Sequence, residues 1–318
     1  MLRRLFRRKS LAASPLRPGL VTGHKDARPD DSPALHVRVG GHLVRCVSYG
    51  KGPRFGPSIV FLHEGLGSIA QWKHFPDTLA RATGCNALVY ERHGHGGSDA
   101  LHGRRRADFM EREAADVLPK VLDSFGIEKA ILFGHSDGGS IALLFAARYP
   151  ERTLGVITEA AHVFVEEVSL AGVRAAVTRF DSSDMEKRLA LYHGDNTESM
   201  FRGWADIWLS PEFRDWTIPA ETLGAIEAPV LAMQGADDEY GSAEQLLRIE
   251  AGLDEAAAVI LPGVGAAART ILIPDCAHEP HVQARETVMD EAINFIETII
   301  PRSRGWRRAG ASRRRGLT

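Results

Sequence analysis

The stretch that decides the fold of this chain is Ala130 to Leu143, A-I-L-F-G-H-S-D-G-G-S-I-A-L. An apolar run of strand character ends in Gly134 and helix-forming residues follow the glycines, so Ser136 lies on a sharp strand-to-helix turn. Glycines two residues before and after the serine suit such a turn, because a side chain at either position would collide with neighbouring backbone. The pattern G-x-S-x-G also arises by chance in a chain with 31 glycines, so its surroundings have to support it.

The rest of the chain alternates strand patterns with helix patterns, which is typical of βαβ units and a mostly parallel sheet. Residues 35–49 alternate apolar and polar side chains around Gly40 and Gly41, as an antiparallel hairpin does. The later strands are short and almost wholly apolar, which indicates cover by helices on both faces. These strands are predicted at Ser58–Leu62, Ala87–Tyr90, Ala130–Phe133, Leu154–Thr158, Val230–Met233 and Thr270–Ile273. Helices are predicted at Trp72–Ala82, Ala107–Phe125, Ser140–Arg148, Ala243–Leu253 and Glu286–Ile299.

The segment 163–226 interrupts this alternation, because it has helical patterns and many aromatic residues but no buried-strand pattern. Such an insertion between two strands of an α/β sheet predicts a helical cap over a site. Most of its aromatic side chains are expected to pack the cap on the body, and Trp204 and Trp208 are the candidates for substrate contact. The predicted core therefore comprises residues 34–162 and 227–300.

The composition is that of an ordinary soluble globular protein, with 44% hydrophobic and 25% charged residues among 318. Three cysteines, Cys46, Cys85 and Cys276, show no C-x-x-C spacing, which argues against a disulfide framework and a zinc site. A reducing compartment, the cytoplasm, is the simpler inference. No apolar run approaches the ~18 residues that span a bilayer.

Both ends of the chain are basic, whereas the middle is acidic. Residues 1–25 and 301–318 each contain seven Lys or Arg and no acid, which leaves residues 26–300 with 25 basic and 41 acidic residues, a charge of −16. We expect residues 1–33 and 301–318 to be disordered extensions, and an organellar transit peptide is the alternative for the Arg-rich start. Nucleic acid is not an expected partner, because the acidic body would repel phosphate.

A serine nucleophile needs a base and an acid that orients the base, and residues of both kinds follow predicted strands. His278 follows the last strand in D-C-A-H-E-P-H. A histidine there would lie beyond the carboxyl edge of the sheet, where ligands bind in open parallel sheets. Three carboxylates, Asp237, Asp238 and Glu239, follow the strand Val230–Met233.

Four stretches together carry a resemblance to a known family. They are L-H-E-G-L-G-S at 62–68, E-R-H-G-H-G-G-S-D at 91–99, G-H-S-D-G-G at 134–139, and G-A-D-D at 235–238 followed by C-A-H-E-P-H at 276–281. Over residues 35–300 the chain resembles capped serine hydrolases of the α/β-hydrolase superfamily. The resemblance implies a mostly parallel α/β sheet with helices on both faces and a helical cap insertion. The order serine, acid, histidine along the chain is also the order of that fold.

The resemblance implies a particular acid and a particular base. The family's usual acid position, three residues after the glycine that ends its strand, falls on Asp238, with Asp237 as the alternative and Glu239 as a weaker one. The family's histidine falls on His278, and His281 matches a second histidine that usually packs nearby. With the elbow serine, Asp238 and His278 form the implied catalytic triad.

The same fold builds an oxyanion hole from two backbone N–H groups, one after the nucleophile and one in the loop after the third strand. Asp137 supplies the first, and Gly65 is predicted to supply the second, with Glu64 as the alternative. Acidic side chains that face a developing anion are unfavourable, so we expect those of Glu64 and Asp137 to point away. If Glu64 faced the pocket instead, it would be placed to recognise a cationic substrate group or to raise a neighbouring pKa.

The residue at the elbow narrows the chemistry. Haloalkane dehalogenases and epoxide hydrolases of this superfamily use aspartate there, and ring-cleavage hydrolases usually show a G-N-S elbow and an H-G-x-G-P-G loop, whereas this chain has Ser136 in G-H-S. We therefore predict a serine hydrolase that cleaves a small or medium, largely apolar carboxylic ester through an acyl-enzyme. The alternative is a carbon-carbon bond hydrolase of ring-cleavage products, or another serine-dependent acyl hydrolase or lyase.

This chemistry requires no cofactor and no metal. The stretch H-G-H-G-G at 93–97 lacks the Lys and Ser/Thr of a phosphate-binding loop. A noncatalytic binding protein of the same fold is a further hypothesis, which the presence of all three triad residues in order disfavours. The predicted partner is a small-molecule ester, and a homodimer is left open.

Overall fold

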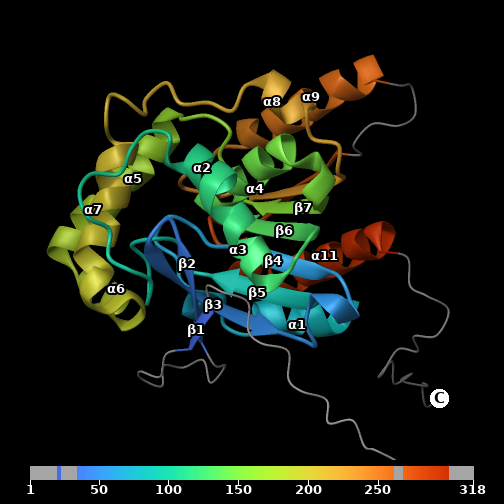
Figure 1. Ribbon diagram of the computed structural model, residues 1–318. Coiled ribbons are helices and arrows are strands. Elements are labelled where there is room, and N and C mark those ends of the chain that lie inside the picture. The colour runs from blue at the N-terminus through green and yellow to red at the C-terminus, as the bar shows by residue number, and fades with distance from the viewer. Residues whose placement is uncertain (1–19, 23–33, 261–267, 301–318) are drawn as a thin grey trace, which may run out of the picture.

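The computed structural model describes residues 20–22, 34–260 and 268–300, and these form one sheet with helices on both of its faces (Figure 1). The nine strands run in the spatial order β1-β2-β3-β5-β4-β6-β7-β8-β9. Their bounds are β1 Leu20–Thr22, β2 Leu35–Val39, β3 His42–Tyr49, β4 Ser58–Leu62, β5 Asn86–Tyr90, β6 Ala130–His135, β7 Thr153–Glu159, β8 Val230–Gly235 and β9 Ala268–Ile273.

The sheet is antiparallel at one edge and parallel elsewhere. Strands β1, β2 and β3 pair antiparallel, and β3 also pairs antiparallel with β5, whereas all pairs from β5 to β9 are parallel. The predicted hairpin is confirmed, with its turn at Gly40 and Gly41, both of which have positive φ. Strand β1 was not predicted, because Leu20–Thr22 falls within the segment expected to be disordered. The other residues of 1–33, and all of 301–318, lie outside the described residues.

The helices fall where the sequence patterns indicate, with shifted ends. Their bounds are α1 Phe75–Thr83, α2 Phe109–Arg112, α3 Leu118–Phe125, α4 Asp137–Arg148, α5 Glu167–Ser182, α6 Met185–His193, α7 Thr197–Trp208, α8 Ala220–Gly224, α9 Glu244–Ile260, α10 Pro280–Gln283 and α11 Arg285–Ile299. Short 3-10 segments are η1 Pro53–Phe55, η2 Ala70–Trp72, η4 Pro150–Arg152 and η5 Gly194–Asn196, and a π-helical turn, η3 Glu113–Val117, joins α2 to α3.

Two apolar clusters fill the space on the two faces of the sheet. One contains Phe75 and Leu79 from α1 with Phe295 and Ile296 from α11. The other contains residues of α2, α3 and α4 and continues into the segment between β7 and β8. The central strands β4, β5, β6 and β8 are buried along their whole length, as their unbroken apolar patterns indicate.

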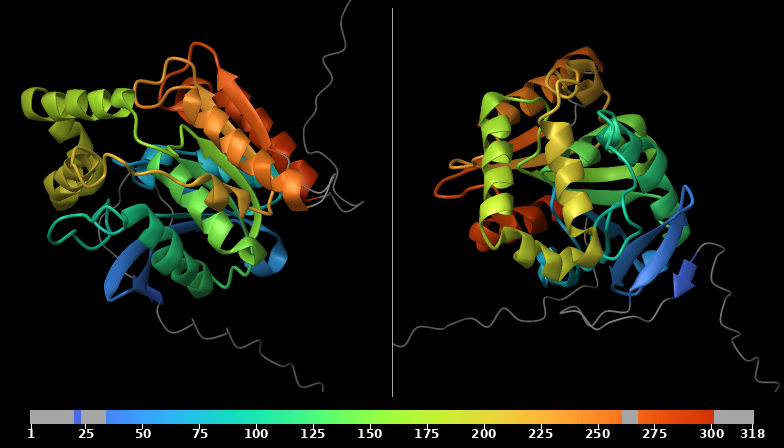
Figure 2. Two further views of the ribbon diagram at one scale, coloured as in Figure 1. Left: turned by 90° about the horizontal axis from the view of Figure 1, so that it is seen from above. Right: turned by 90° about the vertical axis from the view of Figure 1, so that its left-hand side faces the viewer.

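The segment between β7 and β8 is helical, in agreement with its sequence pattern. Helices α5, α6 and α7 gather on one side of the sheet, on the left in Figure 1 and facing the viewer in the right-hand view of Figure 2. The predicted cap also included α8, but α8 packs on α4 and α9 of the core. None of the described helices is long and apolar enough to cross a membrane.

Candidate active site

The parallel register brings the ends of several strands together. Leu62 at the end of β4 pairs with Gly134 on β6, and His135 at the end of β6 pairs with Glu159 at the end of β7. The loops that follow these strands therefore start at one edge of the sheet. They line a cavity of about 250 Å³ whose opposite wall comes from α5, α6 and α7.

Ser136 is held in a backbone conformation that few residues other than glycine adopt. It lies between β6 and α4 with φ 53° and ψ −121°. The turn closes tightly around it, since a Cβ on Gly134 would collide with the carbonyl of Gly138, and one on Gly138 with the carbonyl of Leu62. The two glycines therefore allow the strained turn that presents the serine to the cavity.

Ser136, His278 and Asp238 form a continuous hydrogen-bonded chain. The Oγ of Ser136 lies 3.0 Å from Nε2 of His278, and Nδ1 of His278 lies 2.8 and 2.9 Å from the two carboxylate oxygens of Asp238. Because the carboxylate only accepts, Nδ1 donates to it, and Nε2 is left to accept from the serine hydroxyl. Asp237, the alternative acid, is exposed to solvent.

The surroundings of Asp238 keep it ionised. Its oxygens also accept from the Gln234 side chain at 2.5 Å and from the main-chain N–H groups of Tyr240 and Gly241 at 2.8 and 3.2 Å. Burial alone would raise the pKa of Asp238, but its bonds to His278 and to the backbone outweigh burial, and the pKa lies below its ordinary value.

The Asp238 carboxylate has the opposite effect on His278, the predicted base, because it raises the pKa of that residue. Burial lowers the pKa of His278, whereas the hydrogen bond and charge of Asp238 raise it more strongly, so the net pKa lies above 6.5. Glu64 and Glu239 raise it further. The imidazolium form is thus stabilised in place, which is what a base that takes a proton during the reaction requires.

The loop after β4 is held from behind by a buried arginine. Arg92 Nη1 donates to the carbonyl of His63 at 2.6 Å, and Nη2 donates to the carbonyl of Glu64 at 2.9 Å. The carbonyl of Gly65, which lines the cavity, lies 3.1 Å from Nε2 of His95. These contacts fix the orientation of the Gly65 peptide, whose N–H is the predicted second oxyanion donor.

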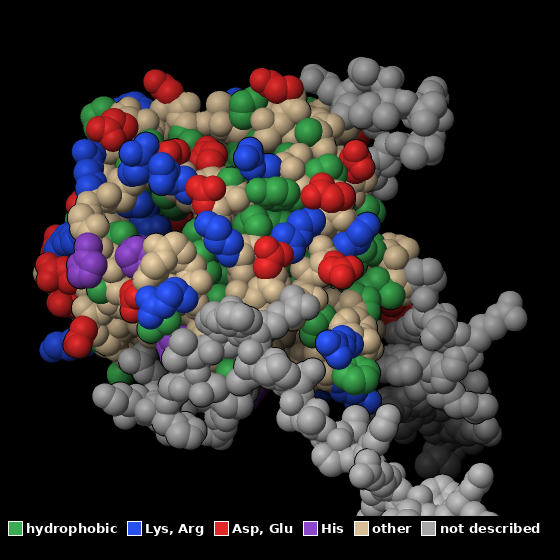
Figure 3. All heavy atoms as spheres, viewed as in Figure 1, with side chains coloured by type: hydrophobic (Ala, Val, Ile, Leu, Met, Phe, Trp, Pro, Cys, Tyr) green, Lys and Arg blue, Asp and Glu red, His purple; other side chains and the backbone are tan. Residues whose placement is uncertain are grey.

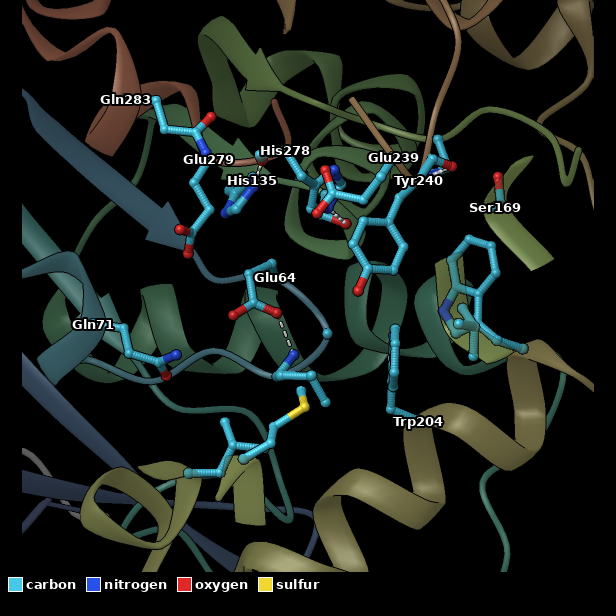
Figure 4. A pocket seen from close by; sticks show the side chains of 18 residues that line it. Glu64, Gln71, His135, Ser169, Trp204, Glu239, Tyr240, His278, Glu279 and Gln283 are labelled. Atoms are coloured by element: carbon cyan, nitrogen blue, oxygen red, sulfur yellow. Dashed lines mark hydrogen bonds between the residues drawn. The ribbon is translucent and has the colours of Figure 1, made fainter. Parts of the chain in front are cut away.

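The two acidic side chains near the predicted oxyanion hole behave differently. Asp137 is buried and turned away from the cavity, with its Oδ2 3.8 Å from Nη2 of Arg92, as expected. Glu64 was also expected to point away, and this expectation is wrong. Its carboxylate faces the cavity and accepts a hydrogen bond from the N–H of Leu66 (Figure 4).

The environment of Glu64 disfavours its charge. Burial, as the largest effect, and the nearby Glu279 raise the pKa of Glu64 to about 7, while the Leu66 N–H, His278 and Arg92 lower it. The carboxyl group therefore changes its charge near neutral pH. This follows from the side chain bending back over its own loop, which no sequence pattern revealed.

The wall opposite the triad is almost entirely apolar. It comprises Ser169 and Val173 from α5, Met185 and Leu189 from α6, and Trp204 and Trp208 from α7. Trp204 lies directly on the loop after β4, since a Cβ on Gly65 would collide with its indole. Both tryptophans predicted to contact substrate thus line the cavity.

Several residues of the site were not predicted from the sequence. Tyr240 lines the cavity with its ring centroid 4.6 Å from that of His278. The carbonyl of Tyr240 lies 3.1 Å from Nε2 of His162, a residue that follows β7. A polar residue just beyond a buried strand was the available signal for His162 and Arg92. His281, predicted to pack nearby, binds Glu159 through Nδ1 at 2.7 Å behind the triad.

Comparison with known proteins agrees with this architecture. The family model described as alpha/beta hydrolase fold matches residues 57–182, a range that includes the loop after β4 and the elbow. The chain has the α/β-hydrolase fold.

The proteins to which this chain is similar include two kinds of enzyme. It is 26% identical to carboxylesterase YbfK of Bacillus subtilis (strain 168), with 84% of this chain and 89% of the esterase covered. It is 25% identical to the 2-hydroxy-6-oxo-6-phenylhexa-2,4-dienoate hydrolase of Burkholderia cepacia, with 66% and 81% covered. Among solved structures, the enol-lactonase from Burkholderia xenovorans LB400 superposes with a TM-score of 0.62 at 20% identity, over 82% of this chain and 99% of that one, and this likeness concerns the fold alone.

Proposed function

We propose that this hydrolase cleaves carboxylic esters through an acyl-enzyme formed on Ser136. The observation that carries the proposal is the 3.0 Å contact between the strained, cavity-facing Ser136 and Nε2 of His278, whose Nδ1 is bound to Asp238. The apolar α5–α7 wall favours a small or medium, largely apolar acyl or alcohol group. The carboxylesterase relative supports the reaction class.

The geometry assigns each group a step. Ser136 Oγ attacks the ester carbonyl carbon while His278 Nε2 takes its proton, and the N–H groups of Gly65 and Asp137 bind the oxyanion. The tetrahedral intermediate collapses as His278 returns the proton to the leaving alcohol. A water molecule, deprotonated by His278, then attacks the acyl-enzyme, and collapse of the second intermediate releases the acid and Ser136.

A carbon-carbon bond hydrolase is the second candidate, and the dienoate hydrolase relative is the observation that favours it. Both candidate reactions would use the same serine, and they differ in the bond that is cleaved. We rank the ester first because the elbow reads G-H-S rather than the G-N-S usual in ring-cleavage hydrolases. The cysteine pattern favours the cytoplasm as the compartment, and a homodimer stays a prediction.

A fluorophosphonate probe tests whether the serine is reactive. The wild type should be labelled and Ser136→Ala should not, while both melt at similar temperatures. Absence of Ser136-dependent labelling would overturn the proposal. A panel of acyl esters of graded chain length, assayed beside a ring-cleavage product, then decides between ester and carbon-carbon bond cleavage.

A further inference from the structure

The charge of the active-site cavity differs from that of the surface around it. Figure 3 shows basic and acidic side chains interspersed over one face of the molecule. The described residues that line the cavity include three carboxylates, Glu64, Glu239 and Glu279, but no Lys or Arg. A substrate that enters this cavity therefore meets negative charge near the reacting serine.

A small side cavity of about 20 Å³ adjoins the main one behind the loop after β4. It shares Glu64, Gln71 and Glu279 with the main cavity, and Ser68 and Trp72 close it. This volume accommodates one water molecule or a group of similar size. Figure 4 shows Glu64, Gln71 and Glu279 on the same side of the main cavity, across from Tyr240 and Trp204.

Three polar atoms on residues that line this side cavity have no hydrogen-bond partner among the described residues. The hydroxyl of Ser68 is fully buried and unpaired, and so are Oε1 of Gln71 and Nε1 of Trp72. An unpaired buried polar atom costs free energy, on the order of 1–3 kcal/mol. Three of them in one small space indicate a polar group that binds there.

None of the described residues that line the side cavity is a Lys or an Arg. Arg92 gives its Nη atoms to the carbonyls of His63 and Glu64 and lies beside Asp137, so it is not bonded to the Glu64 carboxylate. Three histidines line the side cavity as well: burial lowers the pKa values of His63 and His135, and His281 is bonded to Glu159. Glu64 and Glu279 repel each other, and the charges of His278 and Arg92 act against this repulsion.

A primary ammonium group matches these acceptors. It has three N–H donors and no acceptor. The carboxylates of Glu64 and Glu279, Oε1 of Gln71 and Oγ of Ser68 can all accept from it. The Ser68 hydroxyl and the Trp72 N–H can in turn donate to a carboxylate oxygen. A bound ammonium would relieve the repulsion between Glu64 and Glu279 and would offset the negative charge beside the oxyanion hole.

We propose that the side cavity bounded by Glu64, Ser68, Gln71 and Glu279 binds a primary ammonium group of the substrate. Glu64 immediately precedes Gly65 in the chain, so this ammonium lies a short distance from the scissile carbonyl. The preferred ester thus joins an apolar portion, held by the α5–α7 wall, to an amine near the reacting bond. This inference rests on the proposed ester hydrolysis.

Matched pairs of esters test the proposal. The 4-nitrophenyl esters of alanine and isobutyric acid differ by an ammonium in place of a methyl group on the acyl side, and 2-aminoethyl and propyl butanoate differ likewise on the alcohol side. For each pair, the kcat/KM of the ammonium ester is divided by that of the neutral ester, and this ratio is divided by the ratio of their spontaneous hydrolysis rates at the same pH. The result is called the corrected ratio. We expect the wild type to favour the ammonium member in at least one pair by about tenfold or more, the usual effect of hydrogen bonds to a charged group.

Variants test which residues cause the preference for the ammonium ester. Glu64→Gln and Glu279→Gln should each lower the corrected ratio about tenfold, whereas Glu239→Gln, which removes a carboxylate of the main cavity that does not line the side cavity, should retain it. Inhibition of the wild type by methylammonium at concentrations where methanol has no effect provides a check that does not depend on variant folding.

The outcomes separate this inference from the proposed function. If neutral esters are cleaved with Ser136 dependence but the corrected ratio stays near one in both pairs, the side cavity holds water only and the inference is overturned. A high ratio that survives both Glu64→Gln and Glu279→Gln overturns it as well. If no ester is cleaved and the fluorophosphonate does not label Ser136, the proposed function itself fails.

Discussion

The two walls of the active-site cavity are built on different principles. The core wall consists of loops that follow strand ends, and it carries Ser136, His278 and every carboxylate of the cavity. The cap wall consists of the helices α5, α6 and α7, and only Ser169 among its lining side chains is not apolar or aromatic. We therefore expect substitutions on the core wall to alter the chemical step and substitutions on the cap wall to alter which substrate binds.

The strongest test of this division replaces one serine on each wall and compares the losses of activity. Ser136→Ala should lower kcat/KM by about 10⁴ to 10⁶, because no other group can form the acyl-enzyme. Ser169→Ala on the cap wall is the matched control and should change kcat/KM by less than about tenfold, the effect of one neutral hydrogen bond. Steady-state kinetics with one ester measures both, and comparable losses in the two variants would contradict the division.

A second comparison uses two adjacent aspartates in the loop after β8, one bonded to His278 and one exposed. Asp238→Asn should lower kcat by about 10⁴, because an amide that donates to Nδ1 stabilises the wrong tautomer of His278. Asp237→Asn, one residue earlier and exposed, should leave kcat close to that of the wild type. Kinetics and thermal melting of both variants check the assignment, and a larger loss in Asp237→Asn would transfer the orienting role to that residue.

On the cap wall the largest expected effect comes from a tryptophan. Trp204→Ala should raise KM for an apolar ester about tenfold, with a smaller change in kcat, because burial of an apolar group of this size contributes about 1.5–3 kcal/mol. Trp216→Ala is the control, since Trp216 lies in the same inter-strand segment but does not line the cavity. An equal rise in KM in both variants would show that general loosening of the segment, not a lost contact, is responsible.

The smallest expected effect is a shift in the pH dependence of kcat/KM. Because the pKa of His278 is raised and its neutral form is the base, kcat/KM should fall as pH decreases through a value above 6.5. The charge of Glu64 contributes to that rise, so Glu64→Gln should move the acidic limb of the profile to lower pH. A pH-rate profile for a neutral ester measures the shift, and an unchanged limb would mean that the two groups are not coupled.

Local pattern predicted most of the fold and the catalytic constellation, for a physical reason. Buried parallel strands are continuous apolar runs, and the first polar residues beyond them must lie at the sheet edge, which predicted Ser136, His278 and the three carboxylates at 237–239. The choice of Asp238 among these carboxylates came from the resemblance to capped serine hydrolases. The first turn of α4 was missed because Asp137, Gly138 and Gly139 have poor helix propensity. Close packing nevertheless favours both glycines, because a Cβ on Gly138 would collide with Leu62 of β4 and one on Gly139 with Ala161.

The orientation of side chains within a loop was not predictable in the same way. The Glu64 side chain bends back over its own loop, where its carboxylate faces the cavity and accepts a hydrogen bond from the N–H of Leu66, two residues later. The side cavity likewise depends on Ser68, Gln71 and Trp72 meeting Glu279 from the other end of the chain. Contacts of this kind arise from tertiary structure, and the hydrophobic periodicity of the sequence does not predict them.

The contact between Trp204 and Gly65 has a consequence for protein engineering. One indole forms part of the wall that holds the substrate and also lies against the peptide assigned to the oxyanion hole. A library that varies position 204 to admit bulkier acids will therefore change turnover together with selectivity. Variation at Val173 or Leu189, which line the cavity from α5 and α6, offers a route to new substrates with the catalytic loop left undisturbed.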